Sequence, residues 1–335
     1  MTSAARAFVC IDDQWTHAGL RTIVLENDRI RVEILPELGA RVNRIVHRAS
    51  GTDLLWHNPR IEPRLVPIGA SYDDNFAGGW DELFPNDLAG PVGDETYPDH
   101  GELWSQCWSH EIVARGPDEV SVTLRRTGSV TTTEIEKTIT LKAGESQLHF
   151  AHRMTNVGTR GFDFLWKLHP ALAIDAGDRI DVPAASAELV DPAFGRLSSP
   201  RTFEWPIARP EGKSPVDVSE VPALDGSRDF VYVNELSDGW CALRRRKLDL
   251  GFGLVFPREI FSSVWLFMTF GGWRGLETVV LEPCTTVPKD LNAAIARGTA
   301  RRLEPGESLA CTIRAVVFEG AEPLRGFDAH GTPLR

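Results

Sequence analysis

The sequence lacks the features that mark exported, disulfide-bonded or membrane-spanning proteins. No stretch of its 335 residues approaches the roughly 18 consecutive apolar residues of a spanning helix, and Met1–Cys10 lacks the apolar core of a signal peptide. The five cysteines are odd in number and form no Cys-x-x-Cys pair, so neither a disulfide framework nor a thiolate zinc site is indicated. We therefore predict a cytoplasmic protein that does not span a membrane.

The chain also lacks an excess of positive charge. It carries 36 Lys and Arg residues against 47 Asp and Glu residues, which gives a formal net charge of -11. Partners rich in phosphate, such as nucleic acids and anionic membrane surfaces, would be repelled by this charge. We expect the partner to be a small molecule, bound by a monomer or a homodimer.

Motifs for metals and organic cofactors are missing as well. None of the nine histidines belongs to a His-x-His or Glu-x-x-His motif, and His149 and His152 would point to opposite faces of a strand. A glycine-rich phosphate-binding loop is also absent from the sequence. The sequence therefore predicts neither a metal site nor a cofactor.

What the sequence does contain is a long series of short strand patterns. In Thr133–Lys142, Ile135 and Ile139 share one face, opposite Glu134 and Glu136, which is typical of an antiparallel strand with one solvated face. Similar patterns recur in residues 30–47, 107–115, 119–126, 146–156, 162–174, 179–182, 230–234, 240–245, 250–256, 263–270, 277–282 and 308–318.

Helical patterns are almost absent. Only Pro288–Arg297 has helical character, with a proline in its first turn and Gly298 placed as a C-cap. The proline-rich residues 183–222 are expected to form a connecting loop. Many short strands with few short helices predict an all-β fold, a large antiparallel β-sandwich formed by one domain that covers residues 1–335.

Two segments combine polar and aromatic residues in a way that suggests a binding site. Residues 60–104 lose the strand alternation and are rich in Gly, Pro, Asp and aromatic residues, as long ordered loops with a function often are. The second segment is Trp166–Pro170. A single His or Trp is usually structural, so the combination carries more weight than any one residue. The candidates in these segments are Asp74, Trp80, Glu82, His100, Trp104, Lys167 and His169.

A third candidate is the carboxylate of Glu282. The β-branched and apolar residues Thr278–Leu281 predict a buried strand, and Pro283 cannot donate to a sheet ladder, so we expect pairing to lapse there. A carboxylate buried at a strand end has a raised pKa and can act as a general base. The alternative is that Glu282 turns to solvent or pairs with an arginine such as Arg274.

Taken together, these segments resemble the aldose 1-epimerase (galactose mutarotase) family. The resemblance implies the galactose mutarotase-like β-supersandwich fold and extends through nearly the whole chain. The matching pieces are Val32–Gly39, Gly78–Trp80, His100–Gly101, Lys167–Pro170, Leu281–Pro283 and Leu303–Ser308.

The resemblance also implies roles for individual residues. It makes Glu282 the general base, His169 the general acid and His100 a residue that contacts the sugar and assists. Lys167 and Leu168 precede His169, where galactose-specific members have a paired or Thr-preceded histidine, and the family's early substrate-binding arginine has no clear counterpart. Which sugar binds, and whether it is charged, therefore stays open. The expected substrate-binding residues are Asp74, Trp80, Glu82, Trp104, Lys167 and Trp273.

The chemistry of anomer interconversion suits these residues. One group removes the proton of the anomeric hydroxyl while another protonates the ring oxygen, so no nucleophile, metal or redox cofactor is needed. Two other functions stay open. A glycoside hydrolase would use Glu282 with a second carboxylate such as Asp74 or Glu82, and a non-catalytic carbohydrate-binding protein would use its tryptophans as stacking surfaces.

Overall fold

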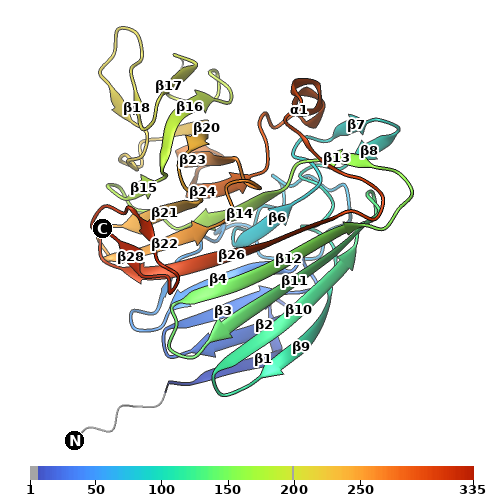
Figure 1. Ribbon diagram of the computed structural model, residues 1–335. Coiled ribbons are helices and arrows are strands. Elements are labelled where there is room, and N and C mark those ends of the chain that lie inside the picture. Colours follow the sequence, from blue (N-terminus) through green and yellow to red (C-terminus); the bar gives the residue numbers. More distant parts are fainter. Residues whose placement is uncertain (1–6, 198–199) are drawn as a thin grey trace, which may run out of the picture.

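The computed structural model describes residues 7–197 and 200–335, which form 28 strands and a single short helix (Figure 1). Most strands belong to two large antiparallel sheets, and one continuous cluster of buried apolar side chains lies between them. The predicted all-β sandwich is therefore confirmed. Residues 1–6 and 198–199 of the predicted 1–335 domain lie outside the described ranges.

The larger sheet has 12 strands and carries the segments that sequence analysis singled out. Its order is β1 (Val9–His17), β2 (Leu20–Asn27), β3 (Ile30–Leu35), β4 (Arg41–His47), β6 (Trp80–Leu83), β14 (Lys167–Leu172), β24 (Leu276–Cys284), β23 (Ser263–Trp273), β20 (Ser227–Leu236), β16 (Ala184–Leu189) and β17 (Thr202–Glu204), with β5 (Thr52–Asp53) paired to β4. Strands β6, β14 and β24 lie side by side near its middle.

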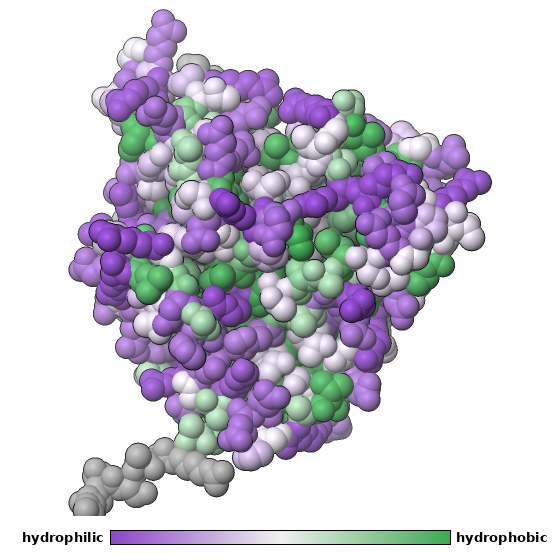
Figure 2. Space-filling view, viewed as in Figure 1, coloured by the Kyte–Doolittle hydropathy of each residue, from purple (hydrophilic) through white to green (hydrophobic). Residues whose placement is uncertain are grey.

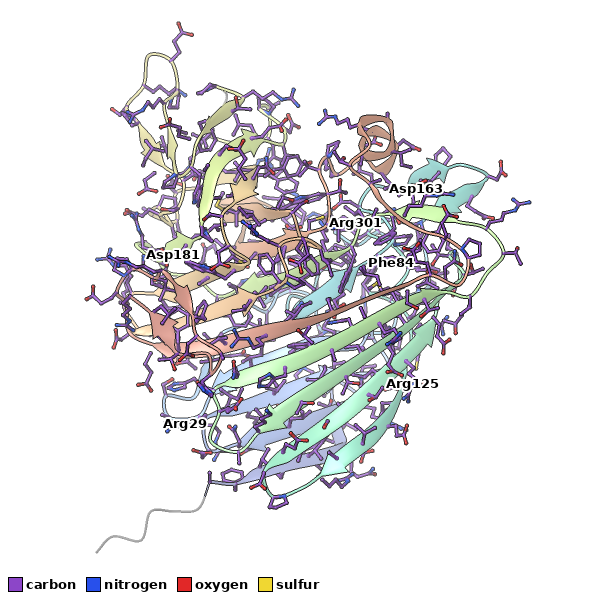
Figure 3. All side chains as sticks on the ribbon, in the orientation of Figure 1. Arg29, Phe84, Arg125, Asp163, Asp181 and Arg301 are labelled. Atoms are coloured by element: carbon purple, nitrogen blue, oxygen red, sulfur yellow. The ribbon has the colours of Figure 1, made fainter. Side chains whose placement is uncertain are left out.

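The second sheet has eight strands, and the face opposite the core lies on the outside of the molecule (Figure 1). That face is largely hydrophilic in Figure 2. On it, Arg125, labelled in Figure 3, pairs with Glu136 and Glu111 on the neighbouring strands. The order is β15 (Arg179–Asp181), β21 (Trp240–Arg245), β22 (Leu250–Val255), β26 (Ser308–Glu319), β12 (Gln147–Asn156), β11 (Thr133–Lys142), β10 (Glu119–Thr127) and β9 (Ser109–Arg115).

Four strand pairs and the helix complete the fold. The helix α1 (Leu291–Arg297) begins after Asp290, whose side chain accepts a hydrogen bond from the Ala293 N–H, and ends at Gly298 with a φ of 69°. No helix in residues 7–197 and 200–335 has the length and apolar character to cross a membrane. The pairs are β7 (Gly90–Val92) with β8 (Glu95–Tyr97), β13 (Phe162–Phe164) with β25 (Arg301–Leu303), β18 (Ile207–Ala208) with β19 (Val216–Asp217), and β27 (Gly326–Phe327) with β28 (Pro333–Leu334).

Some strands have no clear sequence pattern. The expectation that residues 183–222 form only a loop is wrong, because β16 to β19 lie there and the prolines fall between them. Strand β6 was also missed. All four of its residues are buried, and both Asp81 and Glu82 are neutralised by partners on opposite faces of the sheet, so no apolar alternation marks it.

Strand alternation sends the candidate catalytic side chains to the face of the larger sheet that the second sheet does not cover. Leu168 and Leu281 belong to the core between the sheets. Lys167, His169 and Glu282 flank these leucines in sequence and therefore point the opposite way.

The prediction that pairing lapses at Pro283 is wrong as stated, because β24 continues to Cys284 and Pro283 pairs in register with Val264 of β23. An interruption occurs only toward β14, where Lys167 is opposite Cys284 and the next partners are Ala171 and Val280. Pro170 and Pro283 both lie in this interval, and neither has an N–H to donate. The gap in the ladder coincides with the positions of His169 and Glu282.

Candidate active site

A cavity of about 250 Å³ opens on the uncovered face of the larger sheet. This volume is near the lower end of the range for small-molecule sites. Strands β14, β23 and β24 form its floor, and the loops that precede and follow β6 supply much of its wall. The lining residues are Tyr72, Asp73, Phe76, Asp87, Leu88, Asp99, His100, Lys167, His169, Asp191, Phe194, Phe230, Phe267, Trp273, Val280, Glu282 and Lys289.

Glu282 lies in the cavity as a buried carboxylate with a cationic partner. The ammonium of Lys167 donates to Glu282 Oε2 at 2.7 Å and also contacts the carboxylate of Asp87. Burial raises the pKa of Glu282 above its ordinary value, although the positive charge of Lys167 opposes the rise. Glu282 is therefore a stronger base than an exposed glutamate, and Lys167 fixes its orientation.

His169 lies beside Glu282 and is almost completely buried. Its Nε2 atom is 3.9 Å from Glu282 Oε1, and its Nδ1 atom is 3.1 Å from the Tyr72 hydroxyl. Burial lowers the pKa of His169 well below its ordinary value, and the positive charges of Lys167 and His100 lower it further. His169 is therefore held in its neutral form.

His100 lines the same cavity from the loop after β8, with a φ of 57°. Its Nδ1 atom is 2.8 Å from Asp99 Oδ1, and its ring stacks on Tyr72 with centroids 4.3 Å apart. Burial alone would raise the pKa of Asp99, but the hydrogen bond and positive charge of His100 lower it instead. The Nε2 atom is left as the ring nitrogen available to a ligand.

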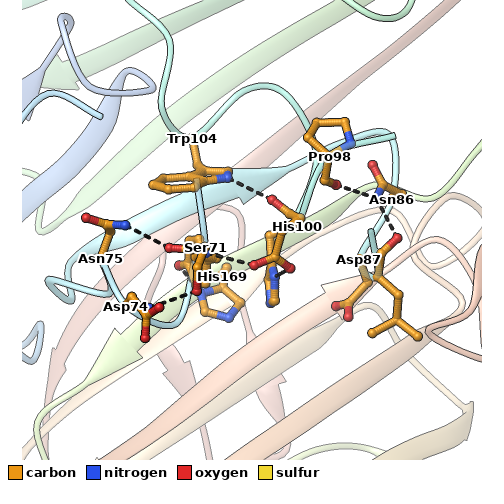
Figure 4. Close-up of polar contacts among 12 residues, drawn as sticks. Ser71, Asp74, Asn75, Asn86, Asp87, Pro98, His100, Trp104 and His169 are labelled. Carbon is orange, nitrogen blue, oxygen red and sulfur yellow. Dashed lines mark hydrogen bonds and ion pairs between the residues drawn. The ribbon is translucent and has the colours of Figure 1, made fainter. Parts of the chain in front are cut away.

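The predicted tryptophans have different positions. Trp273 lines the cavity and packs edge to face on Phe267. Trp104 is buried behind the cavity, where its Nε1 donates to the Asp99 carbonyl (Figure 4). Its ring packs edge to face on Tyr72, with the ring centroids 5.0 Å apart. Trp104 therefore supports the residues that hold His100, and it does not line the cavity.

Three other candidate binding residues do not line the cavity. Trp80 points into the core between the sheets, where it packs on Phe150. Glu82 also faces the core and bonds to Lys137 Nζ at 2.9 Å. Asp74 is exposed and pairs at 2.8 Å with Arg274, the arginine considered above for Glu282. Trp80 and Glu82 flank Asp81 on β6. Because side chains alternate between the two faces of a strand, Trp80 and Glu82 point to the core and Asp81 points to the face of the sheet that carries the cavity.

Sequence analysis missed Tyr72 and Asp99, which contact the two candidate histidines, and Asp87, which contacts Lys167. All three belong to residues 60–104, which the composition marked as functional loops. No local pattern distinguishes these residues from the other polar and aromatic residues there, because the contacts form only when the loop folds over β14 and β24.

Comparison with solved structures shows proteins of the same fold. A candidate aldose 1-epimerase from Klebsiella pneumoniae superimposes with a TM-score of 0.71 at 14% sequence identity, over 93% of this chain and 84% of that protein. A galactose mutarotase-like protein from Clostridium acetobutylicum gives a TM-score of 0.68 at 14% identity, over 93% and 99% of the two chains.

A protein from Synechocystis sp. PCC 6803 is similar as well, with a TM-score of 0.66 at 17% identity over 93% of this chain and 99% of that one. No protein-family model matches the sequence. The fold of the chain is therefore galactose mutarotase-like, and at these identities the similarity extends to the fold alone.

Proposed function

We propose that the protein is an aldose 1-epimerase, which interconverts the α and β anomers of a sugar by opening and closing its ring. The observation that carries this proposal is the convergence of a buried carboxylate, Glu282, and two histidines, His100 and His169, on one monosaccharide-sized cavity. A saturation-transfer NMR measurement of anomer exchange, with and without the protein, tests the proposal directly.

In the proposed reaction, Glu282 accepts the proton of the anomeric hydroxyl while the bond between the anomeric carbon and the ring oxygen breaks. The ring oxygen takes a proton from an imidazolium, and the resulting aldehyde turns about its neighbouring carbon–carbon bond. When the ring closes on the other face of the aldehyde, Glu282 gives its proton to the carbonyl oxygen. The attacking hydroxyl returns its proton to the imidazole. Each positioned acid or base contributes roughly 10²–10⁴ in rate.

The environments of the two histidines support giving the donor role to His100, although the family resemblance assigns that role to His169. His169 is buried near two cationic groups, and its lowered pKa disfavours the imidazolium. At His100, Asp99 Oδ1 lies 2.8 Å from Nδ1 and fixes the orientation of the ring, and His100 is the other histidine that lines the cavity.

The alternatives from sequence analysis predict different products. A glycoside hydrolase would release the aglycone of an aryl glycoside, but Asp74 and Glu82, its candidate second carboxylates, do not line the cavity. A carbohydrate-binding protein would bind the sugar without changing the exchange rate of its anomers. The NMR measurement separates these cases, provided that an aryl glycoside is included in the set of compounds.

The charge of the cavity leads to a prediction about the substrate. Its lining contains five carboxylates and two ammonium groups. The ammonium group of Lys167 is already bound to two of the carboxylates, those of Asp87 and Glu282. A sugar phosphate would therefore be repelled. We expect uncharged aldoses to be interconverted with at least about tenfold higher kcat/KM than their phosphates, since about 1.4 kcal/mol of repulsion suffices for this factor. A preference for a phosphorylated sugar in the same NMR assay would contradict the expectation.

A second prediction concerns metal ions. In residues 7–197 and 200–335, no three His, Cys, Asp or Glu side chains are grouped so that they could hold a metal ion. Dialysis against EDTA is therefore expected to leave the anomer exchange rate unchanged. A loss of activity that a divalent cation restores would refute this expectation, and magnesium-saturated EDTA serves as the control for the chelator itself.

A further inference from the structure

A chain of buried polar side chains runs along the cavity face of the larger sheet, from Arg41 on β4 to His169 on β14. Arg41 Nε and Nη2 each donate to the Asp81 carboxylate at 2.7 Å. The Tyr72 hydroxyl lies 2.9 Å from Asp81 Oδ2 and 3.1 Å from His169 Nδ1. All four side chains are more than nine-tenths buried, so water does not compete for these contacts.

The hydrogen positions in this chain follow from what each group can donate. A carboxylate is only an acceptor, so Tyr72 must donate its O–H to Asp81. Burial raises the pKa of Tyr72, and the negative charge of Asp81 raises it further, so the phenol keeps its proton. The Tyr72 oxygen can then only accept from His169, and the hydrogen between them belongs to Nδ1.

We infer that Arg41, Asp81 and Tyr72 are positioning residues that hold neutral His169 in its Nδ1-protonated tautomer, with Nε2 as a hydrogen-bond acceptor in the cavity. The role of Nε2 toward a sugar hydroxyl rests on the proposed function. The tautomer itself follows from the contacts and can be measured without a substrate.

The groups around His169 support its neutral form. Lys167 on the same strand and His100 from the facing loop disfavour a second proton, whereas Glu282 Oε1, at 3.9 Å, favours one. The phenol oxygen of Tyr72 carries no charge to stabilise an imidazolium. His100 differs, because its Nδ1 atom faces the carboxylate of Asp99.

Tyr72 connects the two histidines. Its hydroxyl meets His169, its ring stacks on His100, and its backbone N–H donates to Asp99 Oδ2 at 2.8 Å. One loop residue therefore gives the two imidazoles different partners, a neutral phenol for His169 and a carboxylate for His100. The inferred consequence is one acceptor and one donor in the same cavity.

The test is a long-range proton–nitrogen NMR correlation spectrum of the nitrogen-15-labelled full chain at neutral pH. A His169→Asn variant assigns the signals of His169. In the native protein, we expect Nδ1 at the shift of a protonated ring nitrogen and Nε2 at that of an unprotonated one. Protonation of Nε2 in the native protein would overturn the inference, and this result needs no other variant.

Tyr72→Phe removes the accepting oxygen and keeps the ring that stacks on His100. We expect a mixture of His169 tautomers and an anomer exchange kcat lowered by ~10- to ~10²-fold, with little change in KM. The control is Tyr97→Phe, a buried tyrosine that does not line the cavity, which should retain the native spectrum and rate.

An unchanged His169 tautomer in folded Tyr72→Phe protein would overturn the inference. If the native protein has the expected tautomer but does not exchange anomers, the inference about Tyr72 stands and the proposed function fails.

Discussion

Replacing Glu282 by glutamine is expected to lower the kcat of anomer exchange by roughly 10²-fold or more, because the amide keeps the shape of the side chain and loses its basicity. Affinity for the sugar should stay within a small factor. The measurement is saturation-transfer NMR across a range of sugar concentrations, which separates kcat from KM. The Lys167 ammonium would still have the Asp87 carboxylate as a partner in this variant.

Glu82→Gln is the matched control, because Glu82 is also a buried glutamate on a strand of the larger sheet. It faces the core, where it bonds to Lys137 and His152. The change should reduce stability and leave the kcat of folded protein within a few-fold of native. If Glu282→Gln exchanges anomers at the native rate, Glu282 is a structural carboxylate and the proposed mechanism fails.

Replacing Lys167 by methionine is expected to have the largest effect on stability. The change keeps the length of the side chain but removes the cation shared by Asp87 and Glu282, and it leaves two buried carboxylates without their partner. Removing one member of a buried ion pair costs about 3–5 kcal/mol in free energy of unfolding. Urea unfolding followed by tryptophan fluorescence gives this value, and anomer exchange should be lost as well.

The loss of stability in Lys167→Met should depend on pH. In the native protein, Lys167 helps to lower the folded-state pKa of Asp87 below 3.8, although burial opposes it, so the stabilisation is present at neutral pH and disappears as pH falls through the lowered value. In Lys167→Met, burial without the cation raises the pKa values of Asp87 and Glu282, so protonation relieves the destabilisation. The difference in stability between the two proteins should therefore be largest at neutral pH. It should begin to shrink above pH 4.5, as Glu282 of the variant takes up its proton, and it should continue to shrink toward the lowered pKa of Asp87 in the native protein.

Lys137→Met is the control that distinguishes a loss of stability from a loss of catalytic activity. Lys137 is a buried lysine paired with Glu82 between the sheets, so its loss should also destabilise the protein. Because it does not line the cavity, folded Lys137→Met should keep the native kcat. If Lys167→Met is as stable as the native protein at neutral pH, the assignment of Lys167 as the partner of both carboxylates is wrong.

The sequence by itself determined the class of fold and much of the floor of the cavity. Period-two patterns report which side chains face a core, so β11 could be predicted from local residues alone, and the continuous β-branched and apolar run Thr278–Leu281 likewise predicted β24. His169 and Glu282 also alternate with Leu168 and Leu281, which predicts that they share a face once β14 and β24 are neighbours. Strand β6 gave no such signal, because Asp81 and Glu82 are neutralised by residues distant in sequence.

Only the tertiary structure decided what each candidate residue contacts. Trp80 and Glu82 face the core, whereas Tyr72, from a loop without a regular pattern, reaches both His100 and His169. Protonation states depend on burial and on charges brought together from distant parts of the chain, and no spacing in the sequence encodes these. The division of roles between the two histidines is therefore a property of the folded loop over β14 and β24, since the packing of that loop gives each imidazole its partner.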